Sequence, residues 1–269
     1  MTATPAAASF GRLYLVPTPL DHGCDAPVAL PAVLPMGTIE TAARLTHWIC
    51  ESAKSTRAFL KRVHEVTPLA APVQAQHMAE LPRQAHKKGD HGPAARTHVD
   101  ARALLAPALQ GHDVGLISEA GMPAVADPGS SVVRAAHALG LAVVPLVGPV
   151  SILLALAASG LNGQNFAFVG YLPQDTAARA QRIRALEALA LKTGQTQLFI
   201  ETPYRNTALL AALAGGLQGS TRLAVASALT LPGEQVRCLS AAQWQALLRR
   251  DDNLPARLAA QPCLFAIGP

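Results

Sequence analysis

The sequence predicts a two-domain α/β protein in which helices flank a mostly parallel first sheet and a mixed second sheet. Hydrophobic residues make up 50% of the 269 residues, aromatic residues 4% and charged residues 14%. Such a composition, rich in Ala, Leu and Val, is typical of parallel strands covered by helices. From residue 113 onward, short apolar runs alternate with helical patterns, as in βαβ units. The chain can bury a large core, which excludes a disordered or fibrous protein.

The first predicted domain covers residues 12–147 and follows a loose tail over residues 1–11. Its expected strands cover residues 12–16, 113–118 and 141–146. Its expected helices cover residues 39–48, a segment ending at 109, and residues 128–139. Two prolines end the first strand, and Thr38 is expected to cap the first helix. Residues 83–98 are polar and basic, which indicates a flexible loop or an insertion.

The second predicted domain covers residues 148–269 and begins where Gly148 and Pro149 break the chain. Its expected strands cover residues 166–170, 196–201, 222–228, 235–239 and 262–267. Its expected helices cover residues 177–191, 206–214 and 241–249. The late strands follow one another closely, which indicates antiparallel pairs within a mixed sheet.

Charge and motif content exclude several classes of protein. Lys and Arg number 22 against 17 Asp and Glu, so the chain permits an anionic partner without requiring one. No apolar run reaches the ~18 residues of a membrane span, and no export signal is recognisable, so we expect a cytoplasmic protein. The four cysteines lack Cys-x-x-Cys spacing, and His86, His91 and His98 lack companion ligands, so no metal is expected. Dinucleotide-binding, P-loop and serine-esterase motifs are absent.

Residues 117–129, with the sequence ISEAGMPAVADPG, form the most informative segment. They join a buried strand to a helix through small residues, so a ligand can lie against bare backbone at the carboxyl end of a parallel sheet. Residues 118–123 therefore predict a pocket wall, because this connection is longer than usual. Asp127 before Pro128 has a second interpretation, as the N-cap of the following helix.

Two further loops are expected to follow strands. Residues 148–151 begin a helix whose amide groups can face a carboxylate, although a plain domain hinge fits the same pattern. Residues 200–206 carry Glu201 at the end of a strand and Arg205 four positions later. That pair is explained equally well as a local ion pair.

Together these segments resemble the tetrapyrrole methylase superfamily, and within it the ribosomal RNA small-subunit methyltransferase I branch. The matching stretches are residues 13–20 (LYLVPTPL), 51–57, 113–129 (DVGLISEAGMPAVADPG), 143–151 (VVPLVGPVS), 158–161 (ASGL), 166–173 (FAFVGYLP) and 199–205 (FIETPYR). The likeness covers most of the chain from about residue 12. It implies a two-domain tetrapyrrole-methylase-like fold with S-adenosyl-L-methionine in the cleft between the domains, and a homodimer.

The resemblance also implies the functional residues. The cofactor site would be lined by Ser118, Glu119, Ala120, Gly121, Pro123, Asp127, Gly129, Pro149, Val150, Ser151, Glu201, Thr202, Ser227 and Ala228. The activity implied is methylation of a cytidine 2′-hydroxyl in small-subunit ribosomal RNA. A carboxylate that takes the hydroxyl proton would assist this reaction. Glu51 is the favoured base, with Glu119 and Glu201 as alternatives, and Arg57 is expected to face the acceptor.

The acceptor side of the family pattern is altered in this chain. The branch has Gly-Asn where this chain has Asp21 and His22, and it has Glu-Asp-Thr-Arg where residues 51–57 read ESAKSTR. RNA binding is supported by basic residues 83–96 and by arginines on the helix over 177–191, although a solvated insertion explains the basic residues equally well. Two alternatives therefore stay open: a methyltransferase for a tetrapyrrole or other small molecule, and a non-catalytic S-adenosylmethionine- or RNA-binding relic.

Overall fold

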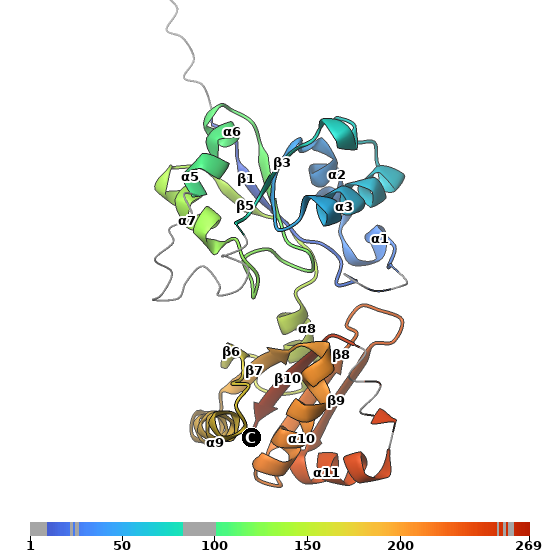
Figure 1. The fold of residues 1–269 in the computed structure, drawn as a ribbon, viewed down its shortest axis with the longest axis vertical. Coiled ribbons are helices and arrows are strands. Elements are labelled where there is room, and N and C mark those ends of the chain that lie inside the picture. Colours follow the sequence, from blue (N-terminus) through green and yellow to red (C-terminus); the bar gives the residue numbers. More distant parts are fainter. Residues whose placement is uncertain are drawn as a thin grey trace, which may run out of the picture. The chain divides into compact units, whose positions relative to one another are not determined.

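A computed structural model describes residues 10–21, 24, 27–82, 101–251, 253–254, 257 and 261–269 (Figure 1). The chain divides into two compact units, residues 1–150 and residues 151–269. The division falls three residues after the boundary that the sequence predicts. Each unit contains one five-stranded sheet.

The sheet of the first unit has the order β3-β2-β4-β1-β5, and every neighbouring pair is parallel. Its strands are β1 (Leu13–Val16), β2 (His47–Cys50), β3 (His77–Glu80), β4 (Val114–Ile117) and β5 (Val143–Pro145). Leu13 and His47 both pair with Val114, and His47 pairs with His77. The strands are therefore in register, with their amino ends along one edge of the sheet and their carboxyl ends along the opposite edge. The parallel first sheet that the sequence predicts is confirmed.

Helices cover both faces of this sheet. One group comprises α1 (Leu30–Val33), α2 (Met36–Arg44) and α3 (Ala53–Val66), and the other comprises α5 (Ala101–Leu104), α6 (Ala106–Leu109) and α7 (Ser130–Ala138), while a 3₁₀ turn η1 (Val73–Ala75) precedes β3. Each group closes its own apolar core. The fully buried Trp48 explains the glycine in β4, because a Cβ on Gly115 would lie 2.6 Å from the indole ring.

The segment around Thr38 differs from the prediction. Pro35, not Thr38, is the N-cap of α2, and the Thr38 hydroxyl donates to the Val147 carbonyl over 2.8 Å. The predicted helix over 39–48 ends at Arg44, because the apolar run that follows forms β2. A short apolar run does not distinguish a helix end from a buried strand. The half-exposed edge strand β3 was not predicted, because its sequence HMAE has no apolar run.

The second unit has a mixed sheet of order β6-β7-β10-β8-β9, as predicted. Its strands are β6 (Phe166–Tyr171), β7 (Thr196–Glu201), β8 (Arg222–Ser227), β9 (Gln235–Ser240) and β10 (Cys263–Gly268). Its helices are α8 (Ser151–Ser159), α9 (Thr176–Thr193), α10 (Asn206–Gly216) and α11 (Ala241–Arg250), with a 3₁₀ turn η2 (Pro203–Arg205). Only β6 and β7 are parallel; the other three neighbouring pairs are antiparallel.

The core of the second unit lies between its sheet and helices α9 to α11. Phe199 and Phe265 stack at its centre, with ring centroids 6.0 Å apart, and both are fully buried. Trp244 of α11 packs beside them and donates its indole N–H to the Leu223 carbonyl over 2.7 Å. Helix α8 packs against β8, β9 and β10. No helix within the described part of the chain has the length and apolar character needed to cross a membrane.

Candidate functional site at the carboxyl ends of the parallel strands

The loops that follow β1 and β4 are joined by backbone hydrogen bonds. Thr18 and Gly121 exchange N–H···O bonds of 3.0 and 3.1 Å, an isolated antiparallel bridge beyond the ends of both strands. The Ser118 hydroxyl donates to the Gly121 carbonyl over 3.1 Å, and the Thr18 hydroxyl donates to the Ser118 carbonyl over 3.3 Å. The two loops that the sequence singles out therefore form one rigid structure at the ligand-binding edge of an open α/β sheet.

The loop after β5 approaches the same place. Gly121 has a φ of +78°, and a Cβ built on it would lie 3.1 Å from a Leu20 methyl carbon and 3.4 Å from the Pro149 carbonyl oxygen. A Cβ on Gly148 would clash with the Pro17 ring at 2.3 Å. Glycine is thus favoured at both positions, by the positive φ at Gly121 and by the close approach of the Pro17 ring at Gly148.

The β4 loop contains backbone strain. Ala124 and Ala126 have φ values of 64° and 63°, in the left-handed region that costs a residue with a Cβ ~1 kcal/mol or more. The loop ends at Gly129, which has a φ of +129° and is the N-cap of α7 without any side-chain cap. The interpretation of Asp127 as the cap is therefore wrong, because α7 begins three residues later, at Ser130. Strain of this kind concentrates at functional sites.

Three carboxyl groups lie within electrostatic reach of one another at this edge. Burial raises the pKa of Asp127 to about 7, and the charges of Glu51 and Glu119 add to the increase. Glu51 follows β2, whereas Glu119 and Asp127 belong to the β4 loop. An Asp with this pKa exchanges its proton near neutral pH, as a general acid or base must. The sequence shows the three residues but not their proximity, and so the raised pKa of Asp127 could not be predicted.

The first turn of α3 contributes to the same edge. Ser52 caps this helix, since its hydroxyl accepts the Ser55 N–H over 3.4 Å. The Ser55 hydroxyl donates to the Glu119 carboxylate over 3.0 Å and so links the helix to the β4 loop. Glu80, at the end of β3, accepts the Ala53 N–H over 2.7 Å. Residues 51–57, which depart from the family pattern, thus form a regular helix start, from which Arg57 extends as an exposed side chain.

A cavity of about 220 Å³ opens between the β1 loop, α3 and the start of the β4 loop. Its polar lining includes Thr18, Asp21, Ser55, Arg62, Ser118 and Glu119. Apolar side chains such as Phe59 and Ile117 complete the wall. The cavity has the mixture of apolar walls and a few placed polar groups that is typical of small-ligand sites.

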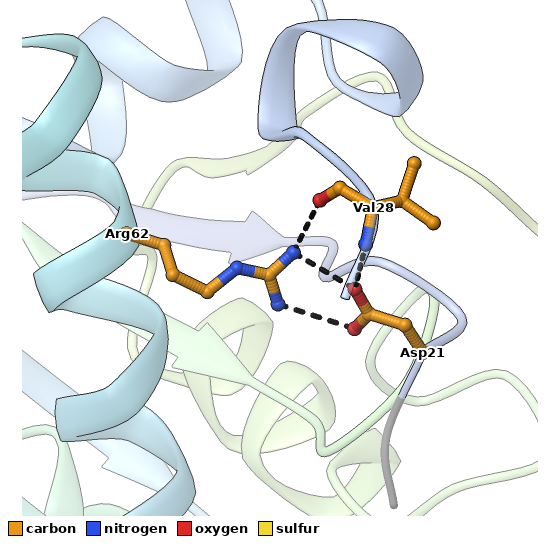
Figure 2. Close-up of polar contacts among 3 residues, drawn as sticks. All are labelled: Asp21, Val28 and Arg62. Atoms are coloured by element: carbon orange, nitrogen blue, oxygen red, sulfur yellow. Dashed lines mark hydrogen bonds and ion pairs between the residues drawn. The ribbon is translucent and has the colours of Figure 1, made fainter. Parts of the chain in front are cut away.

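Asp21 and Arg62, which both line this cavity, bind each other. Figure 2 shows the pair together with Val28. The Arg62 guanidinium binds the Asp21 carboxylate with two hydrogen bonds of 2.8 and 3.2 Å. Val28 joins both groups: its N–H donates to Asp21 over 2.9 Å, and its carbonyl accepts from Arg62 over 2.6 Å. Asp21 and Val28, at the two ends of the segment 21–28, therefore both bind Arg62 of α3. The sequence shows that Asp21 departs from the family pattern, but its partner lies 41 residues later and was not predicted.

The predicted residues of the second unit also share one sheet edge. Cys263 of β10 pairs with Glu201 on one side and with Ser227 on the other. The Glu201 carboxylate accepts hydrogen bonds from the Thr202 N–H at 2.7 Å and from Arg205 at 2.9 Å, so the local ion pair is present. Ala228, itself a predicted site residue, has a φ of +51° and is the third alanine in the left-handed region.

Some predicted features lie outside the described residues. These are the basic segment 83–98 and its histidines His86, His91 and His98. Within the part of the chain that the structure describes, no group of three His, Cys, Asp or Glu side chains is arranged to hold a metal ion.

Comparison with known proteins agrees with this architecture. The family model for Tetrapyrrole (Corrin/Porphyrin) Methylases matches residues 36–243. A ribosomal RNA small subunit methyltransferase I of Mesorhizobium japonicum is 33% identical over 236 residues, which cover 88% of this chain and 69% of that protein. A protein of the same name from Pseudomonas aeruginosa is 37% identical over 53% of this chain and 49% of its own length.

A solved structure shows the same fold. The uroporphyrin-III-C-methyltransferase of Thermus thermophilus superimposes with a TM-score of 0.51 at 18% identity, over 96% of this chain and 94% of that chain. The family match covers well over half of the sequence and includes the β4 loop with its strained alanines. The chain therefore belongs to the tetrapyrrole (corrin/porphyrin) methylases.

Proposed function

We propose that this protein is an S-adenosylmethionine-dependent methyltransferase that modifies a cytidine 2′-hydroxyl in small-subunit ribosomal RNA. The observation that carries the proposal is the convergence of three loops around Gly121, with Asp127 held near a pKa of 7 beside them. The named relatives support the RNA substrate, and they match most of this chain. The second-unit residues Ser151, Glu201, Thr202, Ser227 and Ala228 belong to the proposal as cofactor contacts implied by the family resemblance.

The residues of the first unit fit a cofactor of this kind. Gly121 leaves backbone uncovered where any side chain would contact Leu20 and Pro149, and Ala120 beside it is small. Residues 118–123, Asp127, Gly129, Pro149 and Val150 are the ones that would hold it. The bound cofactor supplies a methyl group that is already activated. The remaining task of the protein is to position the acceptor oxygen and to exclude water.

The chain must also remove a proton from the acceptor hydroxyl. Glu51 is the base that the sequence favours. Asp127 is a better candidate, because a base is most effective when its pKa is close to the working pH. Its pKa is raised to about 7 by burial, Glu51 and Glu119. Glu51 and Glu119 then act indirectly, because their negative charges strengthen Asp127 as a base.

The proposed partners follow from this substrate. Arg57 is exposed on α3 beside the carboxyl edge, where a guanidinium can bind a phosphate of the acceptor strand. A ribosomal substrate places the protein in the cytoplasm. The second unit exposes large apolar side chains, including Leu153 of α8 at 50% and Tyr171 of β6 at 59%. The homodimer belongs to the proposal as an implication of the family resemblance.

The direct test uses purified protein, labelled S-adenosylmethionine and three acceptors: assembled small subunits, naked small-subunit RNA and a porphyrin precursor. Subunits from a strain that lacks this gene are required, so that the target is unmodified. We expect label in RNA and a 2′-O-methylcytidine by mass spectrometry. Label in the porphyrin precursor alone would favour the small-molecule alternative. Cofactor binding without transfer to any acceptor would favour the non-catalytic alternative.

A further inference from the structure

Five basic side chains gather at the opposite, amino-terminal edge of the first sheet. His47 and His77 are the first residues of β2 and β3 and pair with each other in register. His112 stands two residues before Val114, which pairs with His47. Arg12 precedes β1 and Arg44 ends α2, just before β2. We name these five residues the amino-edge cluster. None lies within the stretches that resemble the family, and parallel topology alone brings them together.

The three imidazoles form a stack. The His47 ring lies between those of His77 and His112, with centroid distances of 4.6 Å on both sides and interplanar angles of 14° and 24°. The Thr46 hydroxyl contacts the His47 Nδ1 atom at 3.1 Å. In a face-to-face stack, the ring nitrogens point sideways, so hydrogen-bonding edges remain available to a ligand.

A cavity of about 530 Å³ adjoins this stack. It is lined by Arg12, Arg44, Thr46, His112 and Asp113, among others. The Asp113 carboxylate accepts the backbone N–H of Arg12 over 2.9 Å. Within the described residues, neither Arg12 nor Arg44 forms an ion pair. The Arg44 guanidinium donates a long hydrogen bond of 3.5 Å to the Thr41 hydroxyl. Cationic groups therefore outnumber the single carboxylate of this cavity.

We infer that the amino-edge cluster binds phosphates of the RNA backbone. This inference rests on the proposed function, because it assigns a second contact to the same RNA substrate. Guanidinium groups bind phosphate oxygens through two parallel hydrogen bonds, and protonated imidazoles donate to the same oxygens. The cluster extends over the starts of four adjacent strands and is open to solvent, which suits an extended polyanion better than a small enclosed ligand.

The amino-edge cluster lies away from the proposed site of methyl transfer. The first and last Cα atoms of a four-residue strand lie about 10 Å apart, so the amino edge is separated from the carboxyl edge by that length of strand. Ligands that react in open α/β folds bind at the carboxyl edge. The amino-edge cluster would therefore hold RNA at a distance from the methylated nucleotide. Its loss should weaken RNA binding and leave cofactor binding unchanged.

The stack also links this binding to pH. Burial lowers the pKa of His47, and the neighbouring His112 and His77 lower it further. The other charged groups at this edge are Arg12, Arg44 and Asp113. A bound phosphate adds negative charge beside His47 and favours its protonated form, so binding takes up a proton. RNA affinity should therefore rise as the pH falls from 7.5 to 5.5.

The test is fluorescence anisotropy of the full-length protein with a labelled small-subunit RNA fragment at several salt concentrations. The double variant Arg12→Gln/Arg44→Gln should bind about 10-fold more weakly at 100 mM salt. Its salt dependence, log K against log salt, should be shallower by about 1.4, as expected for two lost phosphate contacts. Arg249→Gln/Arg250→Gln, at the exposed end of α11, is the charge-matched control and should change affinity less than twofold.

Two further measurements test the imidazoles and the class of ligand. His47→Gln should abolish the rise in affinity at low pH, because it removes the imidazole whose pKa is lowered, and it also tests the cluster if the arginine variant does not fold. Inorganic phosphate tests a small-ligand site. If millimolar phosphate binds to the cluster while RNA affinity is the same in all variants, the assignment to RNA is overturned. The same holds if the arginine variant behaves like its control.

The outcome also separates this inference from the proposed function. Wild-type protein that binds RNA through the amino-edge cluster but transfers no methyl group would contradict the proposed function alone. Protein that methylates RNA with unchanged affinity and salt slope in the Arg12→Gln/Arg44→Gln variant would contradict the inference alone.

Discussion

The two edges of the first sheet have opposite chemistry. At the carboxyl edge, Glu51, Glu119 and Asp127 gather around loops strained at Ala124 and Ala126. At the amino edge, three imidazoles and two guanidinium groups gather on unstrained strand starts. One edge therefore concentrates negative charge and backbone strain, and the other concentrates positive charge without strain. The difference indicates that the carboxyl edge is built for chemistry and the amino edge for attachment.

The largest expected effect concerns Asp127. Asp127→Asn keeps the side-chain size and removes the base, so turnover on RNA should fall by about 100-fold or more. The affinity for the demethylated cofactor, measured by calorimetry, should fall much less than turnover, because Asn keeps the shape of the side chain within the proposed cofactor site. In the wild type, turnover should rise with pH through about 7, because Asp127 must lose its proton. This rise should be absent in the variant.

Glu51→Gln is the matched comparison. If Glu51 acts only through its charge, its removal should lower the pKa of Asp127 and shift the pH profile to lower pH, with a modest loss of turnover. If Glu51→Gln abolishes turnover while Asp127→Asn retains it, Glu51 is the base and the assignment of Asp127 is wrong.

The next effect concerns the loop junction. Gly121→Val places a branched side chain at a φ of +78° against Leu20 and Pro149, so cofactor affinity should fall by at least 10-fold. Gly140→Val is the control for strain alone, because Gly140 has a φ of +71° and a Cβ added there would meet no atom within 4 Å. Both variants should lose ~1–2 kcal/mol of stability in a denaturation experiment. Equal cofactor affinity in Gly121→Val and Gly140→Val would show that Gly121 is not part of the cofactor site.

A third effect concerns the link between Asp21 and Arg62. Asp21→Ala leaves a guanidinium that is only 24% exposed without its carboxylate, which should cost ~2 kcal/mol of stability. It should also raise the KM for RNA more than it changes turnover, because the segment 21–28 borders the cavity. The exposed pair of Asp251 and Arg257 is the control, and Asp251→Asn should have a far smaller effect. An unchanged KM would restrict the Asp21–Arg62 pair to a structural role.

The comparison of the two edges also explains what the sequence could predict. The second sheet and three strands of the first sheet (β1, β4 and β5) were predictable, because apolar runs and helical spacing are local patterns, whereas β2 and β3 were missed. The carboxyl-edge loops were predictable because their small residues and glycines are consecutive. The Asp21–Arg62 pair and the His77–His47–His112 stack were not, because their members are far apart in the sequence. Each becomes visible only when strand order and register are known.

The last expected effect concerns stability alone and is the opposite pH dependence of the two edges. The raised pKa of Asp127 means that the folded state binds its proton more tightly than the unfolded state. Stability should therefore fall as the pH rises from about 4 to about 7, and Asp127→Asn should gain ~2 kcal/mol at pH 8 after allowance for solvent screening. The lowered pKa of His47 has the reverse sign, so its contribution is lost as the pH falls below 6.5.

These two dependences can be measured in the first unit alone. Trp48 and Trp244 are the two tryptophans of the chain, one in each unit, so a Trp244→Phe background leaves Trp48 as the reporter of first-unit unfolding. In this background, His47→Gln should flatten the loss of stability at acidic pH without affecting pH 8, whereas Asp127→Asn should raise stability at pH 8. If both variants changed stability in the same pH range, acidic or alkaline, the assignment of opposite charge to the two edges would be wrong.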